Sequence, residues 1–218
     1  MATQPLPRPA TYEDLLRVPD HKVAEILDGE LIVSPRPAPR HANAASAVGA
    51  DLFGPFQRGR GGPGGWWILD EPEVHLGRDI VVPDVAAWRL ERLPRLPSMA
   101  YFALAPDWAC EIVSPSTERY DRLRKMAIYA REQVRRLWLI NPLLRTLEVY
   151  ALEAGPRWSL LGVHGGDAIV RLEPFDAIAM ELGALWADIT PAETEATQDT
   201  AAPPSEAPVE ASEPETVR

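Results

Sequence analysis

The stretch that decides the fold runs from Trp108 to Tyr129 and reads WACEIVSPSTERYDRLRKMAIY. Residues 108–113 form a short apolar run that ends at Ser114-Pro115, a pattern typical of a strand buried on both faces of a sheet. Ser116 or Thr117 can then cap a helix that continues to Tyr129. The segment therefore predicts a strand, a turn and a helix at the centre of the protein.

One acidic residue, Glu111, lies inside this apolar strand. A buried carboxylate costs several kcal/mol unless it is paired, protonated or bound to a metal ion. The helix that follows carries Asp121 and Lys125, which are four residues apart and share one helix face. A simple pairing of Glu111 with an arginine, or a role in capping a turn, is the alternative that spacing alone leaves open.

The chain has 218 residues and a formal charge of −10, and its length fits one domain with a core of useful size. Residues 191–218 hold seven acids and one arginine, so they carry −6 of that charge. Their Pro, Ala, Thr, Ser and Glu composition predicts a disordered, solubilising tail. We expect a flexible N-terminus over residues 1–10, one folded domain over 11–190 and this tail.

A single cysteine, Cys110, lies in the predicted core strand, which excludes a disulfide framework and fits a reducing cytoplasm. The N-terminal MATQPLPRPA lacks the features of a secretory signal, and no apolar run is long enough to span a membrane. We therefore expect a cytoplasmic protein. The acidic charge argues against a sequence-blind nucleic-acid coat protein, but it is compatible with a nuclease that binds DNA locally and through metal ions.

The rest of the chain alternates between strand and helix signals. Asp28-Gly29 between two apolar runs predicts a hairpin over 23–33, and Pro83 in the run 79–88 predicts a bulge or an edge. The segment 136–140, after the central helix, predicts a strand joined to the first by a βαβ crossover. The remaining expected elements are helices at 11–16 and 41–56, a loop at 58–65, strands at 66–69 and 73–76, an antiparallel meander at 147–152, 158–163 and 168–172, and a helical turn at 182–186.

Three acids are predicted to lie inside this mixed α/β fold, namely Glu25, Asp84 and Glu111. Asp84 and Glu111 on adjacent core strands would repel each other if both were ionised in a dry site, and a divalent cation removes that conflict. Oxygen ligands with few histidines favour Mg²⁺ or Mn²⁺ over zinc. Such a site suits phosphodiester hydrolysis, with a nearby lysine to orient or deprotonate the attacking water or to stabilise the transition state.

Several ordered motifs run along the chain: Glu25-Ile26-Leu27-Asp28-Gly29-Glu30-Leu31, Ser34-Pro35, His41, Pro83-Asp84, Glu111-Ile112-Val113-Ser114-Pro115-Ser116-Thr117, Asp121, Lys125, Tyr129 and Leu137-Trp138-Leu139-Ile140-Asn141-Pro142. With these motifs, about residues 11 to 187 resemble the Uma-two family of restriction-endonuclease-like proteins. The resemblance implies a PD-(D/E)XK nuclease fold, a mixed sheet flanked by helices, whose acids bind Mg²⁺ and cleave DNA.

The resemblance assigns Asp84 to the aspartate of the PD element and Glu111 to the second acid, which together would bind the metal. The lysine expected two residues later is absent, because Val113 stands there. Its function is implied to have moved to Lys125, about two helical turns from the cap, and the lysine reaches the site only if the helix leans over the sheet. Glu25 resembles the early glutamate of the family, a third acid.

His41, Ser114 and Asp121 are further candidates for substrate contact. His41 could equally cap a helix or be buried, and Ser114 could cap its turn. Two departures from the family pattern concern turns: Asn141 replaces an aspartate and cannot carry charge, and Gln133 replaces a glycine.

Basic residues cluster in the sequence around the central helix. They could form a phosphate-contacting surface, or they could be ordinary surface charge, with Glu118–Arg122 and Asp121–Lys125 pairing at four-residue spacing. The arginines of loop 58–65 leave the same choice between phosphate contact and a solvated turn. The basic cluster consists of Arg119, Arg122, Arg124, Lys125, Arg131, Arg135 and Arg136.

The seven tryptophans are better explained by core packing or a dimer interface than by base stacking.

The sequence thus predicts a Mg²⁺-dependent DNA endonuclease, with Mn²⁺ as a substitute ion and a homodimer as a candidate assembly. A catalytically inactive nuclease-fold module that binds DNA or supports assembly is the alternative. A third hypothesis is hydrolysis of a small phosphorylated compound.

Overall fold

The computed structural model describes residues 8–187. The expected N-terminal segment falls mainly outside these residues, and the expected acidic tail falls wholly outside them. Within them, no helix has the length and apolar character needed to cross a membrane.

A six-stranded mixed sheet in the order β10-β9-β8-β7-β6-β3 forms the centre of the fold. Its central strand is β7 (Trp108–Ile112), which pairs in parallel with β8 (Arg136–Asn141), while the other pairs are antiparallel. A helical segment joins these two strands and confirms the expected βαβ crossover. The remaining strands of the sheet are β3 (Trp66–Asp70), β6 (Val85–Arg89), β9 (Thr146–Leu152) and β10 (Trp158–Gly165).

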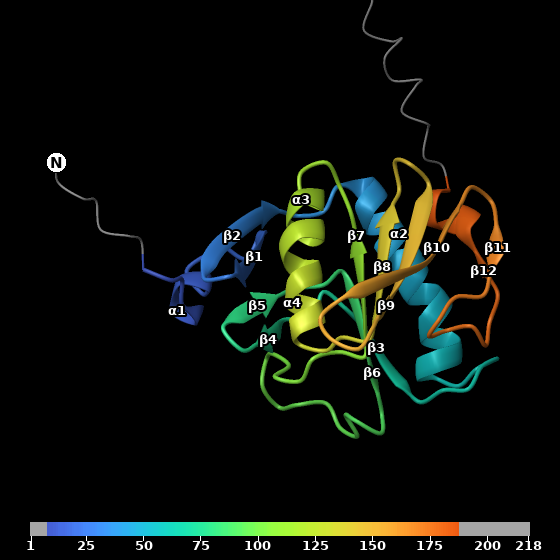
Figure 1. Ribbon diagram of the computed structural model, residues 1–218, viewed down its shortest axis with the longest axis horizontal. Helices are drawn as coiled ribbons and strands as arrows, with labels where there is room; N and C mark the ends of the chain where they lie inside the picture. Colours follow the sequence, from blue (N-terminus) through green and yellow to red (C-terminus); the bar gives the residue numbers. More distant parts are fainter. Residues whose placement is uncertain (1–7, 188–218) are drawn as a thin grey trace, which may run out of the picture.

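Helices cover both faces of this sheet (Figure 1). The crossover consists of α3 (Glu118–Tyr120), η2 (Asp121–Lys125) and α4 (Met126–Arg131). The opposite face carries α2 (Pro39–Leu52), extended by η1 (Phe53–Gln57). The helix expected over 41–56 is therefore present, and the mixed α/β fold class is as expected.

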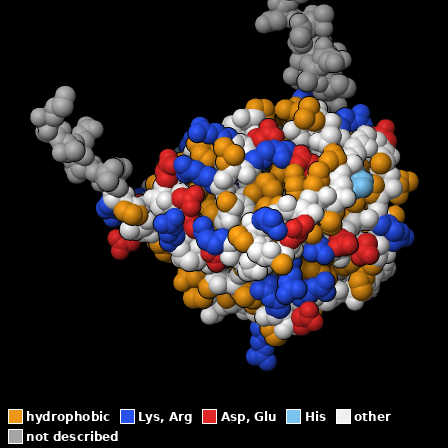
Figure 2. Space-filling view, in the orientation of Figure 1, with side chains coloured by type: hydrophobic (Ala, Val, Ile, Leu, Met, Phe, Trp, Pro, Cys, Tyr) orange, Lys and Arg blue, Asp and Glu red, His pale blue; other side chains and the backbone are white. Residues whose placement is uncertain are grey.

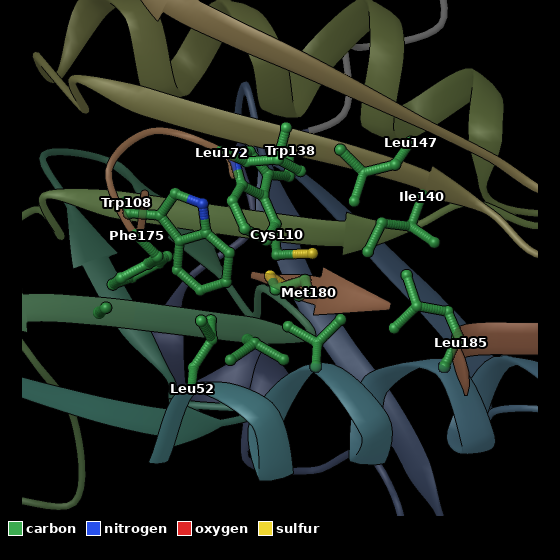
Figure 3. Close-up of a cluster of buried hydrophobic side chains, with 14 of the residues drawn as sticks. Leu52, Trp108, Cys110, Trp138, Ile140, Leu147, Leu172, Phe175, Met180 and Leu185 are labelled. Atoms are coloured by element: carbon green, nitrogen blue, oxygen red, sulfur yellow. The ribbon is translucent and has the colours of Figure 1, made fainter. Parts of the chain in front are cut away.

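The side chains of β7 alternate between the two faces, as the pleat of a strand requires. Trp108 and Cys110 pack into the cluster beneath α2 (Figure 3). Ile112 belongs to the same cluster, whereas Ala109 belongs to the cluster beneath α4. The Trp108 and Trp138 rings meet edge to face at 5.1 Å, a contact worth about 1 kcal/mol beyond area burial. Four tryptophans are fully buried, which confirms core packing as their role: Trp88, Trp108, Trp138 and Trp186.

A second sheet, in the order β2-β1-β5-β4, stands beside the crossover helix (Figure 1). The predicted hairpin is present as β1 (Lys22–Leu27) and β2 (Glu30–Pro35). Asp28 and Gly29 have φ values of +53° and +82°, as a two-residue hairpin turn needs. The helix expected near Thr11 is α1 (Tyr12–Leu15), and β4 (Val74–Leu76) lies at the edge of the sheet.

The run 79–88, which we expected as one interrupted strand, belongs to two different sheets. Its first part is β5 (Asp79–Val81), in the smaller sheet, and its second part is β6, in the larger one. Pro83 lies between them, and a proline cannot donate the backbone hydrogen bond that a continuous strand needs. The chain therefore changes sheets at this point and delivers Asp84 to the junction.

The C-terminal meander differs in its third strand from the one expected. β9 and β10 pair as predicted, but β11 (Ile169–Val170) pairs with β12 (Met180–Glu181) in a separate two-stranded sheet. Because β11 is only two residues long, the apolar pattern of residues 168–172 could not indicate which strand β11 would pair with. The expected helical turn is present as η3 (Leu182–Trp186).

The two departures from the family pattern are accommodated in turns. The Asn141 side chain accepts hydrogen bonds from the backbone N–H groups of Leu143 and Leu144, at 3.1 and 3.0 Å. Gln133 has a φ of +62°, a conformation that glycine adopts at lower cost. Neither residue lines the cleft described below.

Candidate functional site

A cleft of about 370 Å³ lies between the small sheet, the crossover helix and the end of β7. Three structural features meet there: the hairpin, the break after β5 and the helix that follows β7. Every candidate site residue predicted from the sequence lines this cleft: Glu25, His41, Asp84, Glu111, Ser114, Asp121 and Lys125.

Asp84 and Glu111 enter the cleft from neighbouring strands. Val85 is opposite Cys110 in the antiparallel register, so Asp84 is one position beyond β6, beside Glu111. An Oδ2 oxygen of Asp84 accepts a hydrogen bond from the backbone N–H of Ile112 at 2.6 Å. The two acids thus face one cleft, although they are 27 positions apart in the sequence.

Lys125 reaches these acids from the helix. Its Nζ atom lies 2.8 Å from Glu111 Oε2 and 3.1 Å from Glu25 Oε1. It also donates to the backbone carbonyl of Val82, at 3.1 Å. The Val82 N–H donates to Glu25 Oε1 at 2.8 Å, so the break before Pro83 supplies both a donor and an acceptor to the site.

The helix widens where it passes the site. Residues Asp121–Lys125 form a π-helical turn, in which the N–H of Met126 bonds to the carbonyl of Asp121. A π turn holds more residues than an α turn and is often found at functional sites. Asp121 and Lys125 are both buried here, and their charged atoms are 3.8 Å apart.

Burial and neighbouring charges shift the pKa values of Glu111, Lys125 and Asp121. Burial raises the pKa of Glu111 well above its usual value; the charge of Lys125 opposes this, and the nearby acids add to it. Burial lowers the pKa of Lys125, but Glu111, Glu25, Tyr129 and Asp121 outweigh it, so the net shift is well upward. Lys125 is therefore an ammonium ion. Burial, partly offset by Lys125, raises the pKa of Asp121 to about 6.

His41 contacts the other side of Asp84. Its Nε2 atom is 3.2 Å from Asp84 Oδ1, and its side chain is 12% exposed. Burial lowers the pKa of His41, but the hydrogen bond and charge of Asp84, with the charges of Asp121 and Glu71, raise it above the usual value. Its buried Nδ1 atom has no hydrogen-bond partner among the described residues. His41 is therefore held by Asp84 through Nε2, with its Nδ1 atom buried.

Ser114 caps the turn after β7. Its Oγ atom lies 3.0 Å from the hydroxyl oxygens of both Ser116 and Thr117, and the Thr117 N–H donates to it at 3.3 Å. The sequence left open whether Ser114 contacts substrate or caps its turn. These hydrogen bonds support the capping role.

Two residues that the sequence reasoning did not place in the site take part in it. Tyr129 donates a hydrogen bond to Glu111 Oε1 and is fully buried. Its spacing of four residues from Lys125 was the signal that could have revealed it. Glu71 lines the cleft with a φ of +44° and pairs with Arg36 at 3.1 Å, and no sequence pattern pointed to it.

The residues of the cleft fit a divalent cation. Five carboxyl groups line it, from Glu25, Glu71, Asp84, Glu111 and Asp121, against two permanent cations, Arg36 and Lys125. The buried Oδ2 atom of Asp121 has no hydrogen-bond partner among residues 8–187. In that part of the chain no three Asp, Glu, His or Cys residues form a ready-made metal cage. Mg²⁺ needs only one or two carboxylates, with waters and phosphate oxygens completing its shell.

The arginines around the crossover helix are largely engaged in ion pairs. Arg122 pairs with Glu118 at 2.8 Å and also with Glu148, and Arg124 pairs with Glu30 at 2.7 Å. The predicted Glu118–Arg122 and Asp121–Lys125 pairs are both present. These pairs favour ordinary surface charge for the cluster. Figure 2 shows that basic and acidic side chains also occur side by side over the visible face of the molecule.

The fold is that of a nuclease-like protein. A crystal structure of a "putative nuclease belonging to DUF820" from Anabaena variabilis ATCC 29413 matches it with a TM-score of 0.65 and 23% sequence identity, covering 82% of this chain and 98% of that chain. A search of curated proteins gave no match.

The chain itself belongs to the Uma2 family, described as "Putative restriction endonuclease", whose model matches residues 9–183. The resemblance expected from the sequence motifs is thereby confirmed. Membership in this family supports a nuclease-like function with a nucleic acid as substrate.

Proposed function

We propose that the protein is a metal-dependent DNA endonuclease that hydrolyses phosphodiester bonds in this cleft. The observation that supports the proposal most is the convergence of Asp84, Glu111 and Lys125, from three different elements, on one partly enclosed site. Glu25 is the additional acid, and it shares Lys125 with Glu111.

Asp84 and Glu111 would hold Mg²⁺, or Mn²⁺ in its place. The ion would lower the pKa of a bound water and neutralise charge on the scissile phosphate. Lys125 acts as a cation rather than as a base, because its carboxylate neighbours keep it protonated. It therefore stabilises negative charge on the phosphate electrostatically, while Tyr129 fixes the orientation of Glu111. His41 and Asp121, which both line the cleft, would contact the substrate or its water.

The charge balance of the cleft supports a cation of this kind. Arg36 is occupied by Glu71, which leaves Lys125 as the one permanent cation among the other four acids that line the cleft. Carboxylates that lie this close in a partly dry site repel one another unless a proton or a metal ion compensates them. A divalent ion both relieves that repulsion and attracts a phosphate.

Cleavage of supercoiled plasmid in Mg²⁺, with EDTA as the blank, tests the proposal. Asp84→Asn and Glu111→Gln keep the shape of the side chains and should lower the rate by about 100-fold or more. Glu153→Ala removes an exposed acid outside the cleft and should leave the rate unchanged. Thermal melts of each variant show whether the fold is retained.

Other outcomes would favour the rival functions. Cleavage that survives both substitutions places the reaction elsewhere. DNA binding that persists in EDTA, without scission in any divalent metal, identifies a non-catalytic binding or assembly module. Turnover of nucleotides without cleavage of a polymer identifies hydrolysis of a small phosphorylated compound. The homodimer stays a prediction, which light scattering of the purified protein would test.

A further inference from the structure

The cleft has a polar floor and largely apolar walls. The floor holds the acids and Lys125, which come from the two sheets and the crossover helix. The walls are built by the hairpin, by the segment that links it to α2 and by the start of the crossover helix. The apolar or aromatic side chains that line the cleft include Val23, Ile32, Pro35, Pro115 and Tyr120.

The charged groups lie deep in the protein. Glu111, Asp121 and Lys125 are 2%, 4% and 3% exposed, respectively. A volume of about 370 Å³ is in the range of small-molecule sites rather than of an open groove for a double helix. A phosphodiester in an intact duplex reaches a buried floor only if the duplex deforms or unstacks, which costs a few kcal/mol.

Three of the arginines near the cleft are already engaged with other groups of the protein. Arg36 donates to the backbone carbonyl of Asp20 and pairs with Glu71, while Arg122 and Arg124 pair with acids as described above. Proteins that bind a duplex through its backbone gain affinity by neutralising several phosphates with unpaired Lys and Arg. Stacking of an unpaired base on an aromatic side chain adds about 1–3 kcal/mol per base, an attraction that a base inside an intact duplex cannot supply.

We propose that the substrate of this site is an unpaired nucleotide segment, a single strand or a locally unpaired stretch of DNA. One base lodges against the wall formed by Tyr120, Ile32 and Pro115, and its phosphodiester extends to Asp84 and Glu111. The inference rests on the proposed function and adds the class of nucleic acid. Tyr120 is the specificity residue, because among residues 8–187 it is the one tyrosine, tryptophan or phenylalanine that lines the cleft.

The test compares one end-labelled oligonucleotide in three forms, each with Mg²⁺ and the full-length protein. These are the single strand, the fully paired duplex and a duplex with a central bubble. The single strand and the bubble should be cut about tenfold faster than the duplex, or more, as expected from the cost of unstacking. Equal or faster cleavage of the duplex would overturn the inference and leave the proposed function standing.

Variants of Tyr120 test whether this side chain stacks with a base of the substrate. Tyr120→Ala should lower cleavage of the single strand by about tenfold through lost stacking, whereas Tyr120→Phe should retain it. Tyr101→Ala, at a tyrosine that stacks on His75 and does not line the cleft, is the matched control. An unchanged rate for a folded Tyr120→Ala protein contradicts the inference. If no form of the oligonucleotide is cut in any divalent metal, the proposed function itself fails.

Discussion

At the scale of residues, Lys125 explains how this protein holds several acids in its interior. Its ammonium group contacts Glu111, Glu25 and the Val82 carbonyl within about 3 Å, at the distances given above. A buried ion pair adds little net stability relative to an apolar pair, but removing one partner is costly because the other charge stays buried. Lys125 is thus both a catalytic candidate and a requirement of the fold.

Replacing Lys125 by methionine should therefore destabilise the protein by about 3–5 kcal/mol. The loss should grow with rising pH, because the buried Glu111 carboxylate would then have to ionise without the cation that now compensates it. Urea denaturation followed by tryptophan fluorescence measures it. Lys22→Met, at the only other lysine of the chain, is the control, and equal midpoints for the two variants would contradict the account.

Asp121 makes a second residue-scale prediction. Its pKa is raised from 3.8 to about 6, so the native state binds a proton more tightly than the unfolded chain between these values. Stability is therefore lost as the pH rises through this window, by about 2–3 kcal/mol. Asp121→Asn removes this loss. The melting temperature of the variant minus that of the wild type should therefore be roughly 5 °C larger at pH 8 than at pH 4.

Asp176→Asn, at an exposed acid, controls for the loss of a surface charge. If the difference in melting temperature between Asp121→Asn and wild type does not change with pH, ionisation of Asp121 does not destabilise the folded protein, and the prediction is wrong. Saturating Mg²⁺ should reduce the difference at pH 8, because a bound cation stabilises the ionised carboxylates of the wild type.

At the scale of elements, the crossover helix shows what the sequence could and could not predict. The spacing of Asp121 and Lys125 correctly placed both on one helix face. The π turn that presents them is not encoded by any residue pattern we recognise; it accompanies the burial of both charges. The reach of Lys125 depends on how the helix packs over β7, which is a tertiary property.

The hairpin and the strand break give the same lesson. Asp28-Gly29 predicted the hairpin because the positive φ angles of a two-residue turn depend on these two residues alone. Pro83 correctly predicted an interruption, but which sheet each half joins depends on partners far away in the chain. The family resemblance gave Glu25 as a third acid, but its contact with Lys125 was not predicted, since no local signal connects residues 100 positions apart.

The hairpin turn itself can be tested through Gly29. Its φ is +82°, and a Cβ there would lie 3.3 Å from the Cβ of Pro9. Gly29→Ala should cost about 1–2 kcal/mol, because an L side chain is strained in this region. It should also lower activity, since the hairpin carries Glu25.

Gly54→Ala is the matched control for this substitution. Gly54 is helical, and an added Cβ there meets no atom within 4 Å. The change should be neutral or stabilising by about 0.5 kcal/mol. Equal stability of the two variants in thermal melts would contradict the role of the turn.

At the scale of the whole molecule, the site depends on the packing of two sheets and one helix. Glu25, Asp84, Glu111 and Lys125 come from a hairpin, a sheet junction, a core strand and a crossover. The sequence identified these residues by type and by family resemblance. Their hydrogen bonds, and the participation of Tyr129, required the folded arrangement.

Removal of residues 191–218 tests the predicted domain boundary. The family match ends at residue 183, and the composition of the tail predicts no packed core. A chain that ends at residue 190 should keep the melting temperature and cleavage rate of the full-length protein. A clear fall in either would assign the acidic tail a structural or catalytic part.

The central claim is that Asp84 and Glu111 bind one divalent cation. A crystal soaked in Mn²⁺ and measured at the manganese absorption edge tests it directly. The account predicts an anomalous peak in the cleft with carboxylate oxygens of both residues at about 2.2 Å, close to octahedral distances. A saturated crystal with no peak in the cleft, or with an ion that neither residue contacts, would contradict it.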